Sequence, residues 1–323
     1  MHFKVCSRYF YSKLDNTGKR VYEQLLDGWL NYNQEITISG YTDKNMYDDI
    51  IHYIHADNPE LFYIDFNHIS LTFTSRYTVV HVNLRYSVSQ CERIKQEIAG
   101  VVSGVMGLCR RSADPQRVIH DYLVENVQYA SGFRGEDIYN IKGALIDGAA
   151  VCEGYSRAFK LLCDAAGIPC IVVTGTATNS NGRAESHAWN IVSRNNRNYH
   201  VDVTWDGCLD STSGIPLYYN VPDAFISKNH VWDKRMWPAC TDASELDKQI
   251  IPVSGRNGLR DVLVRMSQRG ESVFAVRLNQ RYASINALMD TINGIVSTAS
   301  IDISSFSVSY QPLIDCAIIW FNY

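Results

Sequence analysis

The sequence predicts an α+β protein, in which helices and groups of short strands occupy separate stretches of the chain. Apolar residues recur at helical spacing in 15–34, where Val21, Leu25 and Trp29 share one face. Residues 78–86 instead alternate apolar and polar side chains, as a half-buried hairpin strand does. A third observation is a helix predicted over 151–166 and followed by several strands, which suggests a helix packed against an antiparallel sheet.

The first half of the chain contains most of the predicted helices. Besides 15–34, we expect a helix over 44–56 and strands at 61–66, 69–73 and 78–86. Ser89 and Glu92 have the spacing of a capping box, which predicts a helix to about Arg110. Asp114-Pro115 predicts the cap and first position of the next helix.

The second half begins with a glycine-punctuated segment, 133–150, which we expect to be a loop around a short helix. The helix over 151–166 should end at Gly167. Strands are predicted at about 168–175, 187–193 and 198–205, an irregular linker at 227–248, helices near 257–268 and 281–293, and strands near 272–278, 305–310 and 313–321. We expect three parts, with boundaries at 1–100, 101–240 and 241–323.

Composition narrows the classes of partner. The 323 residues contain 30 Lys and Arg against 34 Asp and Glu, a net charge of −4. This balance disfavours nucleic-acid binding and attraction to anionic membranes, which both require a basic excess. No apolar stretch approaches a membrane span and no secretory leader is recognisable, so we expect a cytoplasmic protein. Its nine cysteines are an odd number, which fits a reduced compartment.

Several catalytic signatures are absent from the sequence. Gly143 and Gly148 have Walker spacing, but alanines follow where Lys and Ser or Thr are required. The sequence contains no His-Glu-x-x-His, no Cys-x-x-Cys and no Gly-x-Ser-x-Gly. We therefore expect no bound metal and no cofactor.

One arrangement of nucleophile and base does occur. Cys152 lies at the predicted start of a helix, where backbone N–H groups and the helix dipole favour a thiolate. His187 begins one predicted strand, and Asp202 lies in the next, beyond a turn at 195–198. Pairing of these strands would let Asp202 reach the His187 imidazole. A Cys–His pair oriented by a carboxylate is the general design of an activated thiol.

The residues around these three positions resemble a known family. Gly148-Ala-Ala-Val-Cys152-Glu-Gly-Tyr, then Gly167-Ile-Pro, His187-Ala-Trp-Asn and His200-Val-Asp202-Val-Thr-Trp-Asp206 are similar to motifs of the bacterial transglutaminase-like superfamily, in the same order. The resemblance covers about 115–240. It implies a papain-like transglutaminase core, with the cysteine helix against an antiparallel sheet and flanking N- and C-terminal α/β parts.

The resemblance also implies roles for these residues. Cys152 would be the nucleophile, His187 the base and acid, and Asp202 the orienting carboxylate. His200, two residues before Asp202, is a rival base. Besides the N–H of Cys152, candidates for the oxyanion donor are Tyr129 and Gln128. Candidates for the substrate cleft are Tyr155, Trp189 and Trp205.

Three functions remain open from the sequence. The first is cysteine-dependent hydrolysis of a peptide or other amide bond through a thioester. The calcium-binding segments of the large animal transglutaminases are not recognisable, which favours hydrolysis. The second is transglutamination or another acyl transfer to an amine. The third is a non-catalytic peptide- or cell-wall-binding module. All three imply a protein or peptide partner, and the oligomeric state is not predicted.

Overall fold

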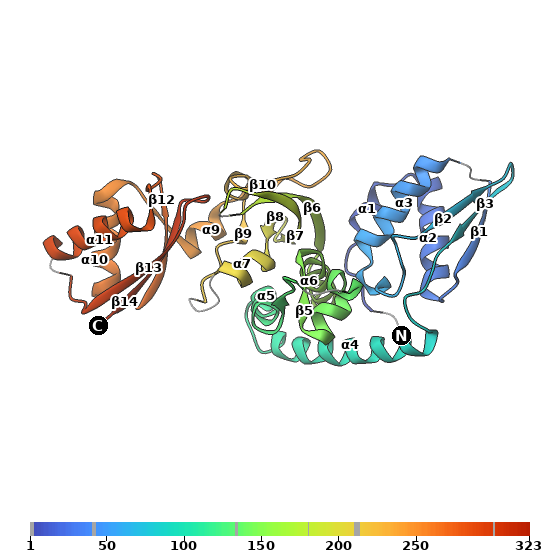
Figure 1. Ribbon diagram of the computed structural model, residues 1–323, viewed down its shortest axis with the longest axis horizontal. Coiled ribbons are helices and arrows are strands. Elements are labelled where there is room, and N and C mark those ends of the chain that lie inside the picture. Colours follow the sequence, from blue (N-terminus) through green and yellow to red (C-terminus); the bar gives the residue numbers. More distant parts are fainter. Residues whose placement is uncertain (1–2, 41–42, 133–134, 180, 210–213, 300) are drawn as a thin grey trace. The chain divides into compact units, whose positions relative to one another are not determined.

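The computed structural model describes residues 3–40, 43–132, 135–179, 181–209, 214–299 and 301–323. The described chain is a mixture of helices and four sheets, which confirms the α+β class (Figure 1). Contacts divide it into two compact units, Met1–Val173 with Ala188–Ser193 and Thr174–His187 with Arg194–Tyr323. The three-part division at residues 100 and 240 stays a prediction.

The first unit opens with helices that pack beside a three-stranded antiparallel sheet. The helices are α1 (Tyr9–Lys13), α2 (Asn16–Leu30), α3 (Lys44–Asp57) and the 3₁₀ turn η1 (Pro59–Leu61). The strands are β1 (Glu35–Ser39), β2 (Ser70–Phe73) and β3 (Tyr77–His81), in the order β1-β3-β2. The predicted face of α2 is buried, as its spacing requires. The strand predicted at 61–66 is wrong, because that segment forms η1 and a turn with one isolated bridge from Ile64 to Leu84.

Two helices lead from this sheet toward the predicted nucleophile. The long helix α4 (Val88–Cys109) begins one residue before Ser89, the first residue of the predicted capping box. Its cap is Ser87, whose backbone N–H donates to Gln90 Oε1 at 2.9 Å, so the pairing of Ser89 with Glu92 is wrong. Helix α5 (Pro115–Asn126) is capped by Asp114, as predicted.

A compact segment then positions helix α6 (Cys152–Ala166). It contains the strands β4 (Gln128–Tyr129) and β5 (Ala149–Ala150), which pair in parallel, the 3₁₀ turn η2 (Glu136–Tyr139) and the π-helical turn η3 (Gly143–Asp147). A Cβ at Gly154 would lie only 2.5 Å from Ile138 O, so η2 can approach the first turn of α6 only because this residue is glycine. Gly167 ends α6 at φ +78°, as predicted.

A five-stranded sheet follows α6, in the order β10-β6-β7-β8-β9. Its strands are β6 (Cys170–Thr178), β7 (Ala184–Arg194), β8 (Arg197–Val201), β9 (Tyr219–Val221) and β10 (His230–Val231). Asn195 and Asn196, both at positive φ, make the tight turn between β7 and β8. β8 ends before Asp202, and helix α7 (Val203–Leu209) begins where the strand was predicted to continue.

The segment 227–248, predicted to be an irregular linker, contains structure that belongs to this sheet. After helix α8 (Asp223–Ile226), strand β10 pairs antiparallel with the end of β6, with His230 opposite Ala177. Helix α9 (Ser244–Gln249) follows. Residues 232–243 are irregular, as predicted, but β10 and α9 were not predicted. A two-residue strand such as β10 has no readable periodicity.

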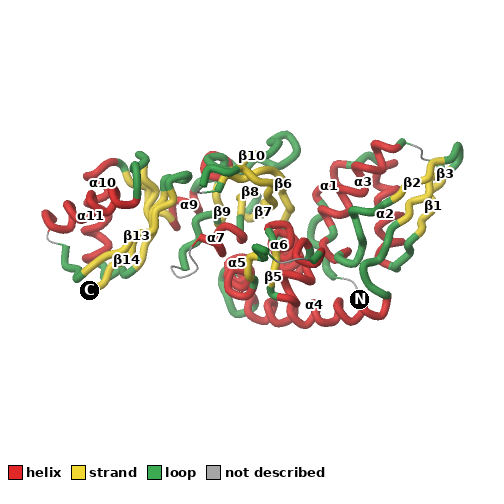
Figure 2. Tube along the Cα trace, in the orientation of Figure 1, coloured by secondary structure: helices red, strands yellow, loops and turns green. Residues whose placement is uncertain are grey.

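The last eighty residues form a four-stranded sheet covered by two helices (Figure 2). The elements are β11 (Ile250–Val253), α10 (Gly255–Gln268), β12 (Val273–Leu278), α11 (Ile285–Ala299), β13 (Ser305–Gln311) and β14 (Cys316–Asn322). β11 and β12 are parallel and are connected by α10, and the strand order in the sheet is β11-β12-β14-β13. Leu263, Ile292 and Ile319 are fully buried between the layers. The predicted helices and strands of this tail are confirmed.

Within the described residues, no helix combines the length and the apolar character that crossing a bilayer would require.

Candidate active site

Cys152 is the first residue of α6 and is partly exposed. The backbone of Val151, the residue before it, is held in place because its N–H donates to Ile138 O at 3.0 Å. The first N–H groups of a helix have no intrahelical acceptor, and the dipole there is positive. The thiol therefore lies where a negative charge on sulfur is favoured.

A buried ion pair anchors α6 further along. Lys160 Nζ donates to Asp164 Oδ2 at 2.9 Å and to the carbonyls of Cys170 and Ser7 at 3.0 and 3.1 Å. Both charged side chains are about 1% exposed. Every proton of the ammonium has an acceptor, so this helix is held both to β6 and to the N-terminal segment.

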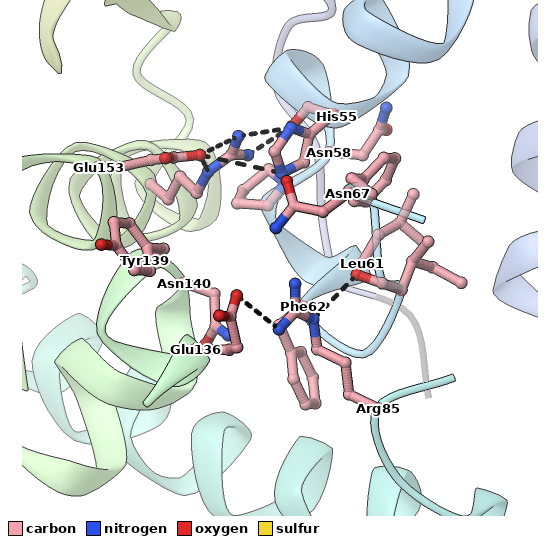
Figure 3. Close-up of a pocket in the computed structure, with 14 residues that line it drawn as sticks. His55, Asn58, Leu61, Phe62, Asn67, Arg85, Glu136, Tyr139, Asn140 and Glu153 are labelled. Carbon is pink, nitrogen blue, oxygen red and sulfur yellow. Dashed lines mark hydrogen bonds and ion pairs between the residues drawn. The ribbon is translucent and has the colours of Figure 1, made fainter. Parts of the chain in front are cut away.

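A pocket of about 310 Å³ adjoins the first turn of α6 (Figure 3). Glu153, next to Cys152, lines it together with Arg157, and Arg85 and Glu136 lie on another side. Arg157 pairs with Glu153 at 2.8 Å, and Arg85 pairs with Glu136 at 3.3 Å. Aromatic side chains complete the wall, namely Phe62, Phe66 and Tyr139. Its four charged groups thus neutralise one another in pairs.

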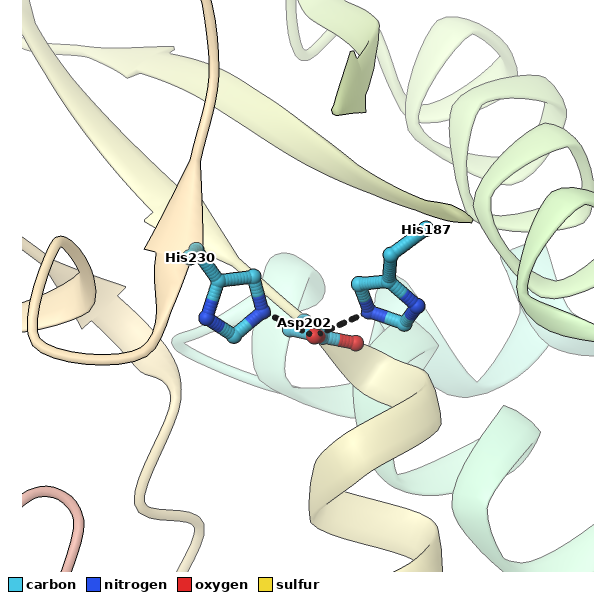
Figure 4. A group of neighbouring side chains, drawn as sticks. All are labelled: His187, Asp202 and His230. Atoms are coloured by element: carbon cyan, nitrogen blue, oxygen red, sulfur yellow. Dashed lines mark hydrogen bonds and ion pairs between the residues drawn. The ribbon is translucent and has the colours of Figure 1, made fainter. Parts of the chain in front are cut away.

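His187 and Asp202 form a buried hydrogen-bonded pair in the second unit (Figure 4). His187 Nε2 lies 2.7 Å from Asp202 Oδ2, and the two side chains are 7% and 0% exposed. Asp202 therefore contacts the His187 imidazole, as the strand spacing predicts. Because Asp202 follows the end of β8, its Oδ1 also accepts the Trp205 N–H of α7 at 3.1 Å.

A second histidine, which the sequence reasoning did not select, bonds to the same carboxylate oxygen. His230 Nε2 lies 3.0 Å from Asp202 Oδ2, and its side chain is fully buried (Figure 4). Its other ring nitrogen, Nδ1, lies 2.8 Å from Asn229 Oδ1. Only the short motif His230-x-Trp232 signals this residue in the sequence, because strand β10 is too short to predict.

The two histidines keep Asp202 ionised. Burial alone would raise the pKa of its carboxyl, but the charge and hydrogen bond of His187, followed by those of His230, hold that pKa well below its usual range. Burial lowers the pKa of His230 despite the opposing Asp202 carboxylate. An ionised carboxylate only accepts hydrogen bonds, so each Nε2 carries a proton and donates it.

His200, the rival base, bonds to a different carboxylate. Its Nε2 lies 2.8 Å from Asp223 Oδ1, and its ring packs edge-on against Trp232. Burial lowers the pKa of His200, and the Asp223 carboxylate opposes this shift. The contact of His200 with Asp223 is therefore separate from the contacts of Asp202 with His187 and His230.

The two candidate oxyanion residues lie in β4, whose partner β5 ends two residues before Cys152. The register pairs Gln128 with Ala149 and Tyr129 with Ala150. The backbone N–H of Gln128 donates to Gly148 O at 2.8 Å, which leaves its side chain as the possible donor. The Tyr129 side chain is 39% exposed.

The three candidate cleft aromatics differ in exposure. Tyr155 and Trp189 are 2% and 1% exposed, and the Tyr155 hydroxyl donates to Val127 O. Both therefore pack in the interior in this structure. Trp205 is partly exposed, and its ring centroid lies 5.7 Å from that of His187 and 4.7 Å from that of His230. Trp205 therefore adjoins the His–Asp pair.

Two clusters among the described residues have donor sets that suit a divalent transition metal. They are His187 with Asp202 and His230, and His200 with Asp223 and Cys240, in each case with ligand atoms within 4.8 Å of one another. In both clusters, the histidine Nε2 atoms also make hydrogen bonds to the carboxylate.

Comparison with known proteins agrees with the motifs. Residues 100–203 match the transglutaminase-like superfamily. The kyphoscoliosis peptidase of Mus musculus is 24% identical over 162 residues, which are 45% of this chain and 24% of that protein. The kyphoscoliosis peptidase of Homo sapiens is 33% identical over 102 residues, which are 27% of this chain and 15% of that protein. The alignments thus span about a quarter or less of these curated relatives.

The similar solved structures have lower sequence identity to this chain. The periplasmic domain of TgpA from Pseudomonas aeruginosa, bound to ethylmercury, is 21% identical and has a TM-score of 0.26 over 40% of this chain and 55% of that chain. A crystal structure of a TGase is 13% identical, with a TM-score of 0.29 over 53% of this chain and 50% of that chain. The motifs and the matched segment together make residues 100–203 similar to the transglutaminase-like superfamily.

Proposed function

We propose that this protein is a cysteine-dependent hydrolase of peptide or other amide bonds, with Cys152, His187 and Asp202 as its triad. The observation that carries the proposal is the buried 2.7 Å hydrogen bond between His187 and Asp202. A histidine held in this way by an ionised carboxylate has its proton on Nε2, so Nδ1 is the basic atom. The helix-start position of Cys152 supplies a suitable nucleophile.

The proposed reaction has two halves. The Cys152 thiol gives its proton to His187 Nδ1, and the sulfur attacks the amide carbonyl. The N–H of Cys152 stabilises the developing oxyanion, with Tyr129 or Gln128 as candidates for the second donor. His187 then protonates the leaving amine, which leaves a thioester on Cys152. In the second half, His187 takes a proton from water, hydroxide attacks the thioester, and the acid and the thiol are released.

Water rather than an amine is the proposed acceptor. An amine attacks the thioester faster than water does only where the cleft excludes water, and aromatic side chains that line the cleft can exclude it. Of the two tryptophans in the triad motifs, Trp189 is buried in the interior, and Trp205 is partly exposed. This favours hydrolysis over amine transfer.

The test is a profile of purified wild-type protein on peptide libraries, read by mass spectrometry, with Cys152→Ala as the control. A second arm adds a labelled primary amine at millimolar concentration. We expect cleaved products that depend on Cys152, with the amine in a minor share of them. Dominant amine adducts would replace the hydrolase proposal with acyl transfer. Absence of any Cys152-dependent turnover, together with an inert thiol, would favour the binding module.

A further inference from the structure

We propose that His230 is a positioning residue of this site, which holds the Asp202 carboxylate so that His187 keeps its reactive orientation and tautomer. The inference rests on the proposed function, because it concerns the same triad. It is carried by the second hydrogen bond on Asp202 Oδ2, which comes from a strand outside the transglutaminase-like segment 100–203.

The contacts of Asp202 show what His230 adds. Oδ1 accepts from the Trp205 N–H at 3.1 Å, and Oδ2 accepts from His187 at 2.7 Å and from His230 at 3.0 Å. The carboxylate is fully buried, so the loss of any one donor would leave its negative charge less compensated. His230 and His187 lie on opposite sides of Asp202, so His230 holds the carboxylate from the side away from His187 and shares its negative charge (Figure 4).

A chain of buried side chains in turn holds His230. Its Nδ1 lies 2.8 Å from Asn229 Oδ1, and Asn229 Nδ2 donates to the Tyr218 hydroxyl at 2.6 Å. Both contacts are buried, so Asn229 and Tyr218 hold the His230 ring while its Nε2 faces Asp202.

Ring packing leaves His230 little freedom to turn. The Trp205 and Tyr218 rings lie 4.7 and 5.6 Å from its centroid, and the His187 ring lies 5.3 Å away. The titratable groups that act on His230 are Asp202 at the end of β8, His187 of β7 and His200 of β8. Asp202 is the one negative charge among these three, so the N–H of His230 is directed to it.

Two substitutions separate hydrogen bonding from packing. His230→Phe keeps a ring and removes the donor, whereas His230→Gln places an amide N–H near the position of Nε2. We expect His230→Phe to lower kcat roughly 10- to 100-fold with little change in KM, and His230→Gln to restore most of the loss. In His230→Phe, the acid limb of the activity–pH profile should move to higher pH. The reason is that the Asp202 charge, no longer shared with His230, would stabilise the His187 imidazolium more strongly.

A double variant tests whether His230 acts through Asp202. Combined with Asp202→Asn, His230→Phe should cause no further loss, because residues that act as a unit are not additive. Equal kcat and equal pH profiles in wild type and His230→Phe would overturn the inference, as would fully additive losses. A wild-type protein without Cys152-dependent turnover would overturn the proposed function instead, so the two failures are distinguishable.

A measurement on the wild-type protein covers the case in which His230→Phe does not fold. Nitrogen-15 NMR of labelled histidine at pH 7, with His230 assigned by loss of its signals in His230→Gln, reports the tautomer. We expect the Nε2–H form with a hydrogen-bonded proton. An Nδ1–H form of His230 would overturn the inference, because such a ring cannot donate to Asp202.

Discussion

His187 and Asp202 are joined by a buried hydrogen bond of 2.7 Å although they are 15 residues apart in sequence. The turn at Asn195 and Asn196 folds β7 back onto β8, and β8 ends one residue before Asp202. The carboxylate can then cap α7 with one oxygen and bond to the imidazole with the other. The same residue thus follows a strand, caps a helix and orients the proposed base.

Removal of the Cys152 thiol should abolish turnover. We expect Cys152→Ala to reduce kcat roughly 10⁶-fold, to background, because the other triad residues cannot supply a nucleophile. Activity of the purified variant is measured together with a thermal melt. Cys6→Ala is the matched control, since it removes another incompletely buried thiol from the same unit and should remain active. Turnover by Cys152→Ala would exclude the triad.

Neutralising Asp202 should leave a residual activity. Asp202→Asn keeps the shape but presents an amide to His187 Nε2, which favours the wrong tautomer, and the expected loss is about 10⁴-fold in kcat. His187→Ala should abolish turnover altogether.

The matched control for Asp202→Asn is Asp223→Asn, which changes the separate His–Asp contact of His200. If Asp223→Asn proves the more damaging, His200 replaces His187 as the candidate base.

Alkylation should begin at Cys152. Among the other cysteines, burial raises the pKa of Cys6, Cys91, Cys109, Cys163, Cys240 and Cys316, to about 12 at the fully buried Cys316. Iodoacetamide near pH 6, followed by mass spectrometry of tryptic peptides, should therefore find Cys152 labelled first. Faster labelling of Cys208, the exposed cysteine of α7, would argue against an activated Cys152.

Stability should fall as the solution becomes mildly acidic. Burial lowers the pKa of His200 and of His230, so below the unfolded value of about 6.5 the unfolded chain binds more protons than the folded one. Stability is complete above that value and decreases toward pH 5, by up to about 1.4 kcal/mol per histidine per pH unit. Denaturant melts at pH 7, 6 and 5 measure it. His200→Gln should reduce this slope, and an unchanged slope would contradict the assignment.

Breaking the buried ion pair of α6 should destabilise the first unit. Lys160→Met leaves Asp164 buried without its cation, and the expected loss is about 3–5 kcal/mol of unfolding free energy. The double variant Lys160→Met with Asp164→Leu should recover part of it, because no charge then stays buried. Urea melts compare the three proteins. A double variant less stable than Lys160→Met would contradict this account.

Local sequence determined much of the fold and the choice of candidate residues. The spacing of apolar residues predicted α2, α3, α10 and α11, and Gly167 marked the end of α6, because these signals act within one or two turns of chain. The motifs around Cys152, His187 and Asp202 could be recognised for the same reason. Ser87 and Ser89 are both possible N-caps of α4, and the sequence alone predicted the wrong one of the two.

Tertiary structure decided the partners of the buried polar groups. His200 and His230 are both histidines near strand ends, and nothing in their neighbours predicts that the first bonds to Asp223 and the second to Asp202. That choice depends on β10 pairing with β6 and on β9 pairing with β8, which are contacts between distant segments. A buried carboxylate takes whichever donors the packed fold brings within about 3 Å, so the second histidine of this site became visible only in three dimensions.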